Sequence, residues 1–241
     1  MPRQDGTRRY TLRAAGLACL VLLATPLRAD DPKVVVELFT SQGCPACPPA
    51  DAFLAQLAAR DDVLALSLHV DYWDYIGWED TFATAANTAR QRGYATASGR
   101  EMVYTPQIVV NGTDGVVGTR FREATALIDT HLASDDDPVS VTVRRDDRQV
   151  HLEAKARRPR DTPLVVRIAR YIPEATVEIV RGENAGRVLT YTNVVTELTE
   201  IATWRTDAPL ALDFDWPRDA PLAVLLQRPD NGPVEAIARL P

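Results

Sequence analysis

The chain has 241 residues and a formal net charge of −6 at pH 7. This acidic balance argues against nucleic acid and against an anionic membrane surface as partners, because both attract positive charge. The first 29 residues are basic, so their removal would make the remainder more acidic still. That remainder, roughly 210 residues, is long enough for one large domain or two of about 100.

Residues 1–29 are predicted to be an export signal peptide. Arginines precede an apolar run over residues 14–27, which is too short to span a bilayer comfortably, and Ala29 stands at the expected cleavage position. The adjacent Arg8 and Arg9 resemble a twin-arginine signal, and an ordinary secretory signal is the alternative. We therefore expect a periplasmic or secreted protein. After cleavage we expect no membrane anchor.

Strand-like apolar runs alternate with helix-like stretches in the first half of the chain. Strands are expected at Val34–Phe39, Val63–Val70, Gln107–Val110 and Gly115–Gly118, and helices at Ala50–Ala59, Thr81–Arg92 and Arg122–Leu132. Asn111-Gly112 predicts an antiparallel hairpin between the last two strands. This order favours a central sheet flanked by helices, in an α/β domain over residues 31–135.

The second half is predicted to be all-β. A polar linker over residues 134–138 is followed by short runs in which apolar and polar residues alternate, at Val139–Arg144, Gln149–Ala156, Leu164–Ile172, Thr176–Val180, Leu210–Phe214 and Leu222–Gln227. Turn-forming residues separate these runs. Strands of this length and spacing predict an all-β sandwich-like domain over residues 138–241.

The pair Cys44 and Cys47 carries the strongest functional signal. Cys-Pro-Ala-Cys at a strand-to-helix junction is typical of a thiol–disulfide redox site. Proline suits the first turn of a helix, so we expect the helix to begin near Pro48, with Cys47 at its cap. Cys44 should then lie in the preceding turn, more exposed, where its thiolate can attack disulfides. Cys19 falls within the export signal, so the mature chain would hold one pair.

Two other interpretations of the cysteine pair stay open. The pair could supply two ligands of a metal site, with His69 as a third, although a structural zinc site needs about four ligands. Neither His131 nor His151 repeats a ligand spacing near the pair. The pair could also be a purely structural bridge.

Residues 34 to about 134 resemble the thioredoxin fold. Besides the cysteine pair, the resemblance rests on Tyr104-Thr105-Pro106, which enters a predicted strand before the hairpin and the last helix. It implies that the bond before Pro106 is cis, that Pro106 packs beside the cysteines, and that Thr105 offers its backbone to a substrate chain. It also implies a buried carboxylate that accepts the proton of the second thiol. Glu37 lies on the corresponding strand; the alternative is that it points to solvent or to the second domain.

More narrowly, the chain resembles a family of secreted bacterial thioredoxin-like proteins of unknown function. The segments that carry this resemblance cover both halves: Glu37–Cys44, Cys47–Asp51, His69–Asp74, Thr105–Gln107 and Arg181–Gly186. The expected activity is thiol–disulfide exchange on the cysteines of other proteins, without a cofactor and with a redox partner protein. Cys44 would be the nucleophile, and Cys47 would resolve the mixed disulfide. A copper-binding chaperone using the same cysteines and a non-catalytic binding module are the alternatives.

Two further segments suggest an interaction surface. Residues 69–100 are rich in aromatic side chains interspersed with acidic ones, which is typical of a binding patch or of a core cluster under a lid. The loop from Arg181 to Arg187 is charged and contains two glycines. We expect this loop to dock near residues 72–78, with its arginines pairing with acidic side chains there, and to form one wall of a substrate groove.

Overall fold

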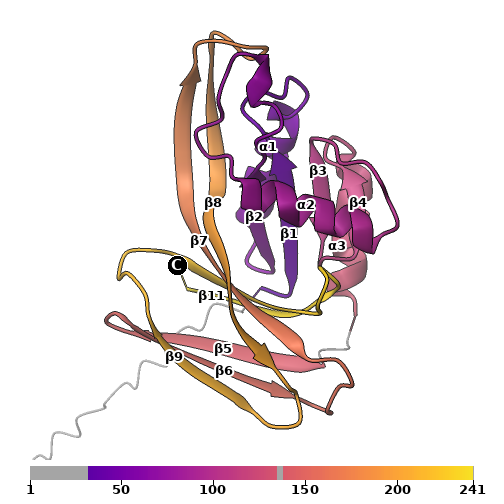
Figure 1. Ribbon diagram of the computed structural model, residues 1–241, viewed down its shortest axis with the longest axis vertical. Coiled ribbons are helices and arrows are strands. Elements are labelled where there is room, and N and C mark those ends of the chain that lie inside the picture. Colours follow the sequence, from indigo (N-terminus) through magenta and orange to yellow (C-terminus); the bar gives the residue numbers. More distant parts are fainter. Residues whose placement is uncertain (1–31, 135–137, 241) are drawn as a thin grey trace, which may run out of the picture.

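The computed structural model describes residues 32–134 and 138–240, so the export signal predicted for residues 1–29 lies outside the described residues. The described chain is a mixed α/β protein built on one eight-stranded and one three-stranded sheet (Figure 1). In chain order its elements are β1 (Val34–Thr40), α1 (Pro48–Ala58), β2 (Val63–His69), the 3-10 turn η1 (Asp74–Ile76), α2 (Ala85–Ala97), β3 (Gln107–Val110), β4 (Asp114–Val117), α3 (Phe121–Leu132), β5 (Val139–Asp146), β6 (Gln149–Ala156), β7 (Leu164–Ile179), β8 (Arg187–Trp204), β9 (Leu210–Asp215), β10 (Leu222–Gln227) and β11 (Val234–Leu240). Of the helices in these ranges, none has the length and apolar character needed to cross a membrane.

The predicted element order of the first half is confirmed. β3 and β4 form the predicted antiparallel hairpin. The Thr113 backbone N–H donates to the Val110 carbonyl at 3.0 Å, and Asn111 and Gly112, between them, both have positive φ. α2 begins at Ala85 rather than at Thr81, because Thr84 caps it: the Thr84 hydroxyl accepts a hydrogen bond from the Asn87 backbone N–H at 3.1 Å.

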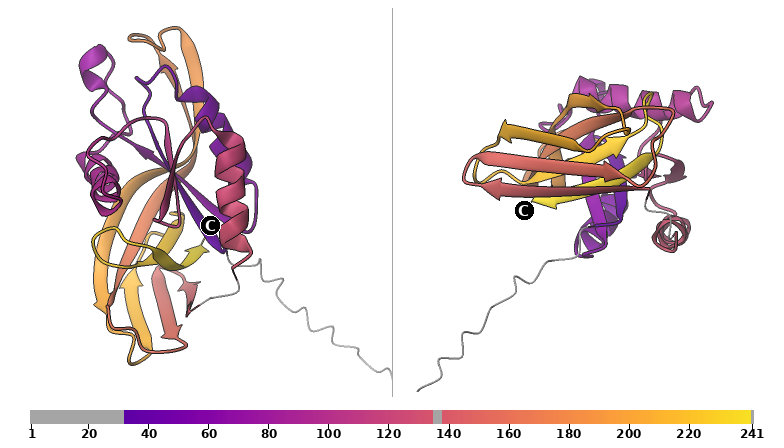
Figure 2. Two further views of the ribbon diagram at one scale, coloured as in Figure 1. Left: turned by 90° about the vertical axis from the view of Figure 1, so that its right-hand side faces the viewer. Right: turned by 90° about the horizontal axis from the view of Figure 1, so that it is seen from below.

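Helices cover both faces of the first-half strands. α1 and α3 lie on one face of the large sheet, and α2 lies on the other (Figure 2). All seven residues of β1 are buried, and alternate residues face different helices. Val34, Val36 and Leu38 join the core under α1 and α3. Val35 and Phe39 join the core that contains Tyr94 of α2.

The two halves of the chain share the eight-stranded sheet, whose order is β11-β10-β7-β8-β2-β1-β3-β4. The halves meet where β8 runs parallel to β2, with Ser67 opposite Val194. Asn193, at φ 49°, turns its amide to donate to the Ala65 carbonyl at 2.9 Å. The remaining strands form a sheet of order β5-β6-β9, which packs on β7 and β10 around Leu152. The second half therefore has two layers, but one of them continues the sheet of the first half. The domain boundary near residues 135–138 stays a prediction.

Two long strands in the second half differ from the strands predicted from the sequence. The two strands expected over residues 164–180 are one strand, β7, and its partner β8 was not predicted; β11 was also missed. Pro173 interrupts β7 without breaking it, because the pairing passes from Ile172 to Glu174. β7 and β8 run most of the length of the molecule (Figure 1) and carry the loop of residues 180–186 to the end where β1 meets α1. The loop therefore lies against the turn that carries Cys44.

Candidate functional site

A disulfide joins Cys44 to Cys47, with the two Cα atoms 5.4 Å apart. The bridge closes the turn between β1 and α1. Cys47 is the N-cap of α1 and prolines fill the first helical positions, as the sequence predicted. The backbone N–H groups of Ala50 and Asp51 both donate to the Cys47 carbonyl. The pair thus stands at the positive end of a helix dipole, which favours a thiolate when the bridge is reduced.

The peptide bond between Thr105 and Pro106 is cis, as expected, and it lies close to this turn. A Cβ added to Gly118 would come within 3.2 Å of the Ala50 Cβ and closer still to the Pro106 Cβ, so Gly118, Ala50 and Pro106 are packed together. Trp73 links the same segments from the other side. Its indole N–H donates to the Thr105 hydroxyl at 2.7 Å, and its Cβ packs on Gly43, next to Cys44. The structure therefore brings Thr105 and Pro106 to the cysteine turn.

The expectation that Cys44 is exposed was wrong: both cysteines are 0% exposed in the disulfide form. Asn184, in the loop between β7 and β8, holds that loop against the cysteine turn. Its amide Nδ2 donates to the carbonyls of both Gln42 and Cys44 at 2.9 Å, and the Asn184 side chain is itself buried. We call residues 181–186 the covering loop.

The covering loop docks where expected, but not through the expected contacts. Gly182, at φ 77°, packs against Trp78, where an added Cβ would lie 3.1 Å from the tryptophan Cβ. Arg187 donates to the Asn184 side-chain oxygen at 2.9 Å rather than to an acidic residue of the segment 71–80. An amide and a glycine, not ion pairs, hold the loop on the cysteine turn.

Glu37 is not brought to the cysteines. It lies on the α2 face of β1, opposite α1, and is buried. The Arg90 guanidinium donates to both of its carboxylate oxygens, at 2.6 and 2.9 Å, and the Tyr94 hydroxyl also donates to it. Arg90 reaches Gln227 of the second half at 3.1 Å. Glu37 therefore belongs to a buried network that ties the two halves together.

Asp51 is a candidate site residue that the sequence interpretation left without a role. It lies four residues after Cys47 on α1, so the two side chains are neighbours on one helix face. Asp51 is 7% exposed, and burial raises the pKa of its carboxyl to about 7, against a lowering hydrogen bond from the Thr40 hydroxyl at 2.7 Å. The sequence signal that could have revealed Asp51 is an acidic residue on the otherwise apolar inner face of a helix.

Asp51 belongs to a larger buried polar cluster under α1. His69 Nδ1 donates to Asp80 at 2.7 Å, and the same Asp80 oxygen accepts the backbone N–H of Gln42, two residues before Cys44. The ring of Tyr191, from β8, packs edge-on against His69 at 4.7 Å between centroids. Among the residues described, no group of three or more His, Cys, Asp or Glu side chains has a geometry that could hold a metal ion.

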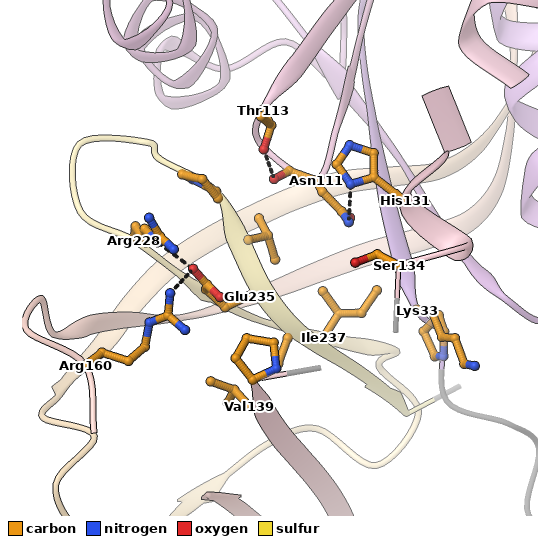
Figure 3. A pocket seen from close by; sticks show the side chains of 15 residues that line it. Lys33, Asn111, Thr113, His131, Ser134, Val139, Arg160, Arg228, Glu235 and Ile237 are labelled. Atoms are coloured by element: carbon orange, nitrogen blue, oxygen red, sulfur yellow. Dashed lines mark hydrogen bonds and ion pairs between the residues drawn. The ribbon is translucent and has the colours of Figure 1, made fainter. Parts of the chain in front are cut away.

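A polar cavity of about 510 Å³ lies at the other end of β1 (Figure 3). Lys33, which precedes β1, lines it together with residues of β11. Arg160 and Arg228 both point to Glu235, and their guanidinium groups pair with its carboxylate. The cavity is thus separated from the cysteine turn by the length of the strand.

Comparisons with known proteins identify the family. The model for "Protein of unknown function (DUF1223)" matches residues 35–227. The chain belongs to the DUF1223 family. A crystal structure of a protein from Agrobacterium tumefaciens is similar, with a TM-score of 0.75 and 32% sequence identity over 88% of this chain and 95% of that one. A search of curated proteins found no match. The matched region of the family contains the cysteine turn and the covering loop alike.

Proposed function

We propose that this DUF1223 protein is an exported thiol–disulfide oxidoreductase that acts on the cysteines of other proteins. The observation that carries the proposal is the Cys44–Cys47 disulfide at the start of α1, packed close to the cis bond before Pro106. We assign the first half to the thioredoxin-like proteins on the same ground, supported by the order β1-α1-β2-α2-β3-β4-α3. The pair also fits the sequence pattern of a redox site.

The chemistry needs only the two cysteines and a partner disulfide. The Cys44 thiolate attacks one sulfur of the partner, forming a mixed disulfide and releasing the other partner sulfur as a thiolate. Cys47 then attacks Cys44, closing the bridge and releasing the second partner thiol. Two electrons pass to the partner, and the reverse sequence oxidises it. Thr105 would align the partner backbone at the attack site.

Asp51 takes the role that the resemblance assigned to Glu37. Cys47 must lose its proton before it can attack, because only a thiolate is nucleophilic. A carboxyl with a pKa of about 7, one helical turn away and buried, is suited to accept that proton. Glu37, engaged by Arg90 on the other face of the sheet, is left with a structural role.

We infer that the covering loop moves before a partner sulfur reaches Cys44, since Cys44 is fully buried and Asn184 of this loop bonds its carbonyl. The surface around the loop suits a protein partner. Tyr75 of η1 is 84% exposed and Met102 is 78% exposed, and they lie on the two segments joined by the Trp73–Thr105 hydrogen bond. These two side chains would give a partner apolar contacts near the cysteine turn.

Export is supported by the signal predicted over residues 1–29 and by the single cysteine pair that follows it. An exported protein with one cysteine pair suits an oxidising compartment, where other exported proteins carry disulfides. The partners would then be thiols or disulfides of exported proteins and a redox protein that resets the pair.

The proposal is tested by following reduction of insulin disulfides by the mature protein in the presence of dithiothreitol. We expect insulin chains to precipitate faster with the parent protein than with dithiothreitol alone. Cys44→Ser should remove the whole effect, because no sulfur is left to attack. Equal rates with and without the parent protein, over a range of protein concentrations, would contradict the proposal.

A further inference from the structure

We propose that His69, held by Asp80, is the second proton carrier of the cysteine site: it takes from Asp51 the proton that Cys47 gives up in the resolving step. This inference rests on the proposed function and names two residues that act behind Asp51. His69 and Asp80 come from β2 and from the segment before α2, so neither is near the cysteines in sequence.

The sheet places His69 next to Asp51. His69 lies directly opposite Thr40 in the parallel pair of β1 and β2, so both side chains point to the α1 face. Thr40 in turn donates its hydroxyl hydrogen bond to Asp51. The carboxyl and the imidazole are therefore both neighbours of one threonine, and both are shielded from solvent.

The two nitrogens of His69 have different surroundings. Nδ1 donates to Asp80, whose carboxylate also accepts the backbone N–H groups of Gln42 and Phe82 at 2.7 and 2.9 Å. These bonds fix the ring. Nε2 is buried without a hydrogen-bond partner among the described residues, as are Ser67 Oγ and the Tyr191 hydroxyl. Buried polar atoms normally have partners, so three such atoms on one sheet face indicate a place where a proton or a water molecule is exchanged.

The titratable groups around Asp51 come from three elements. His69 of β2 lowers its pKa, whereas Asp80 and burial raise it. Tyr191 of β8 is the third, and burial together with the nearby carboxylates raises the pKa of its hydroxyl, so it stays protonated at neutral pH. An imidazole is the side chain that takes and gives protons near neutrality. Of these groups, His69 is the one suited to carry the proton onward.

The Cys47 thiol proton passes to the Asp51 carboxylate and then, through a bridging water molecule, to the unpartnered His69 Nε2, where the Asp80 carboxylate stabilises the imidazolium. The Cys47 thiolate attacks Cys44; the new bond joins Cys44 to Cys47, and the bond from Cys44 to the partner breaks. The partner sulfur leaves as a thiolate and takes a proton from solvent, and His69 later returns its proton to solvent.

The test separates the two sulfur steps. Reduced mature protein is mixed in a stopped-flow instrument with 5,5′-dithiobis(2-nitrobenzoate), which releases one coloured thiolate on attack by Cys44 and a second on attack by Cys47. His69→Asn keeps an N–H where Nδ1 donates to Asp80 but has no atom in place of Nε2. Asp80→Asn keeps an acceptor oxygen for Gln42 and removes the charge. His131→Asn is the matched control, because His131 forms a similar pair with Asp114 at 2.8 Å elsewhere in the fold.

We expect the second phase to slow in His69→Asn by ~10-fold or more, below the roughly 10²-fold of a group acting directly on the reacting atom. The rate of the second phase should rise with pH when it is measured from about pH 6 to about pH 8. The midpoint of this rise should move to higher pH in His69→Asn and to lower pH in Asp80→Asn, because His69 lowers the pKa of Asp51 and Asp80 raises it. The double variant should be no slower than the slower single variant, because the pair acts as a unit.

A second phase with parental rate and pH profile in folded His69→Asn would overturn the inference while leaving the proposed function intact. Absence of the first phase in the parent protein would instead overturn the proposed function. If His69→Asn does not fold, Asp80→Asn tests the inference through its downward pH shift, since the side-chain oxygen that accepts from Gln42 and His69 can be retained. His131→Asn should match the parent in both phases; a slowing there equal to that of His69→Asn would also count against the inference.

Discussion

Replacing Asn184 with alanine should expose the disulfide to reductants. The Asn184 amide makes two hydrogen bonds of 2.9 Å, to the carbonyls of Gln42 and Cys44, and nothing else in the covering loop bonds to Cys44. Each buried hydrogen bond contributes about 0.5–1.5 kcal/mol net, so their loss should favour the open loop by ~1–3 kcal/mol. Since ~1.4 kcal/mol corresponds to a factor of ten, the open population should rise ~5- to ~150-fold.

The rate of reduction by dithiothreitol reports this population, because a reductant reaches Cys44 only when the loop is open. Samples are quenched in acid and alkylated, and the number of free thiols is obtained from the mass that alkylation adds, measured by mass spectrometry. Glu183→Ala is the control: this side chain is exposed in the same loop and should leave the rate unchanged. If Asn184→Ala is folded and is reduced at the parental rate, Asn184 does not gate the site and the reasoning from burial is refuted.

Three other variants test separate parts of the structure. Cys47→Ser should accumulate mixed disulfides with partner proteins, visible on a non-reducing gel, because the attacking thiol survives and the resolving one is gone; trapping by Cys44→Ser instead would reverse the two roles. Asp51→Asn should match the parent in urea unfolding below about pH 4, become steadily more stable than it as pH rises, and level off above about pH 7 at an advantage of up to ~4 kcal/mol. The reason is that burial raises the folded pKa of the Asp51 carboxyl to about 7, above its ordinary value of 3.8, so ionisation costs stability as pH rises. Arg90→Ala should lower the free energy of unfolding by ~3–5 kcal/mol, because it removes the cation paired with the buried Glu37 carboxylate. The control is Arg120→Ala: Arg120 is exposed, and its loss should change the free energy of unfolding by less than ~0.5 kcal/mol. A change no larger for Arg90→Ala than for Arg120→Ala would contradict the structural role of Glu37.

Local sequence signals were enough to predict the order of helices and strands in the first half of the chain. The start of α1 follows from its prolines, and the β3–β4 turn follows from Asn111-Gly112, because each residue type restricts the backbone by itself. The strand β8 could not be found this way. It pairs with β7 on one side and with β2 on the other, and Asn193 disrupts its alternation at the point where it joins β2. Partners distant in sequence decide that register.

The site could be located but not completed from the sequence. The cysteine pair and Pro106 are visible as motifs. The role of Glu37 was undetermined because β1 is buried on both faces, so its apolar pattern does not show which face Glu37 takes. Asn184 is the one buried side chain in a loop of exposed residues, and loops have no period that reveals such a position. His69, Asp80 and Asp51 meet only through the pairing of β1 with β2 and the packing of α1.

The most direct test of the account is the equilibrium of the Cys44–Cys47 pair in glutathione redox buffers, measured on the folded mature protein by counting alkylated thiols. An exchange-active pair should open and close reversibly as one two-electron couple, with a midpoint above about −300 mV, the range below which structural disulfides typically fall. A pair that stays oxidised in every glutathione buffer, and opens only when the protein is unfolded, would be a structural bridge and would contradict the proposed thiol–disulfide exchange.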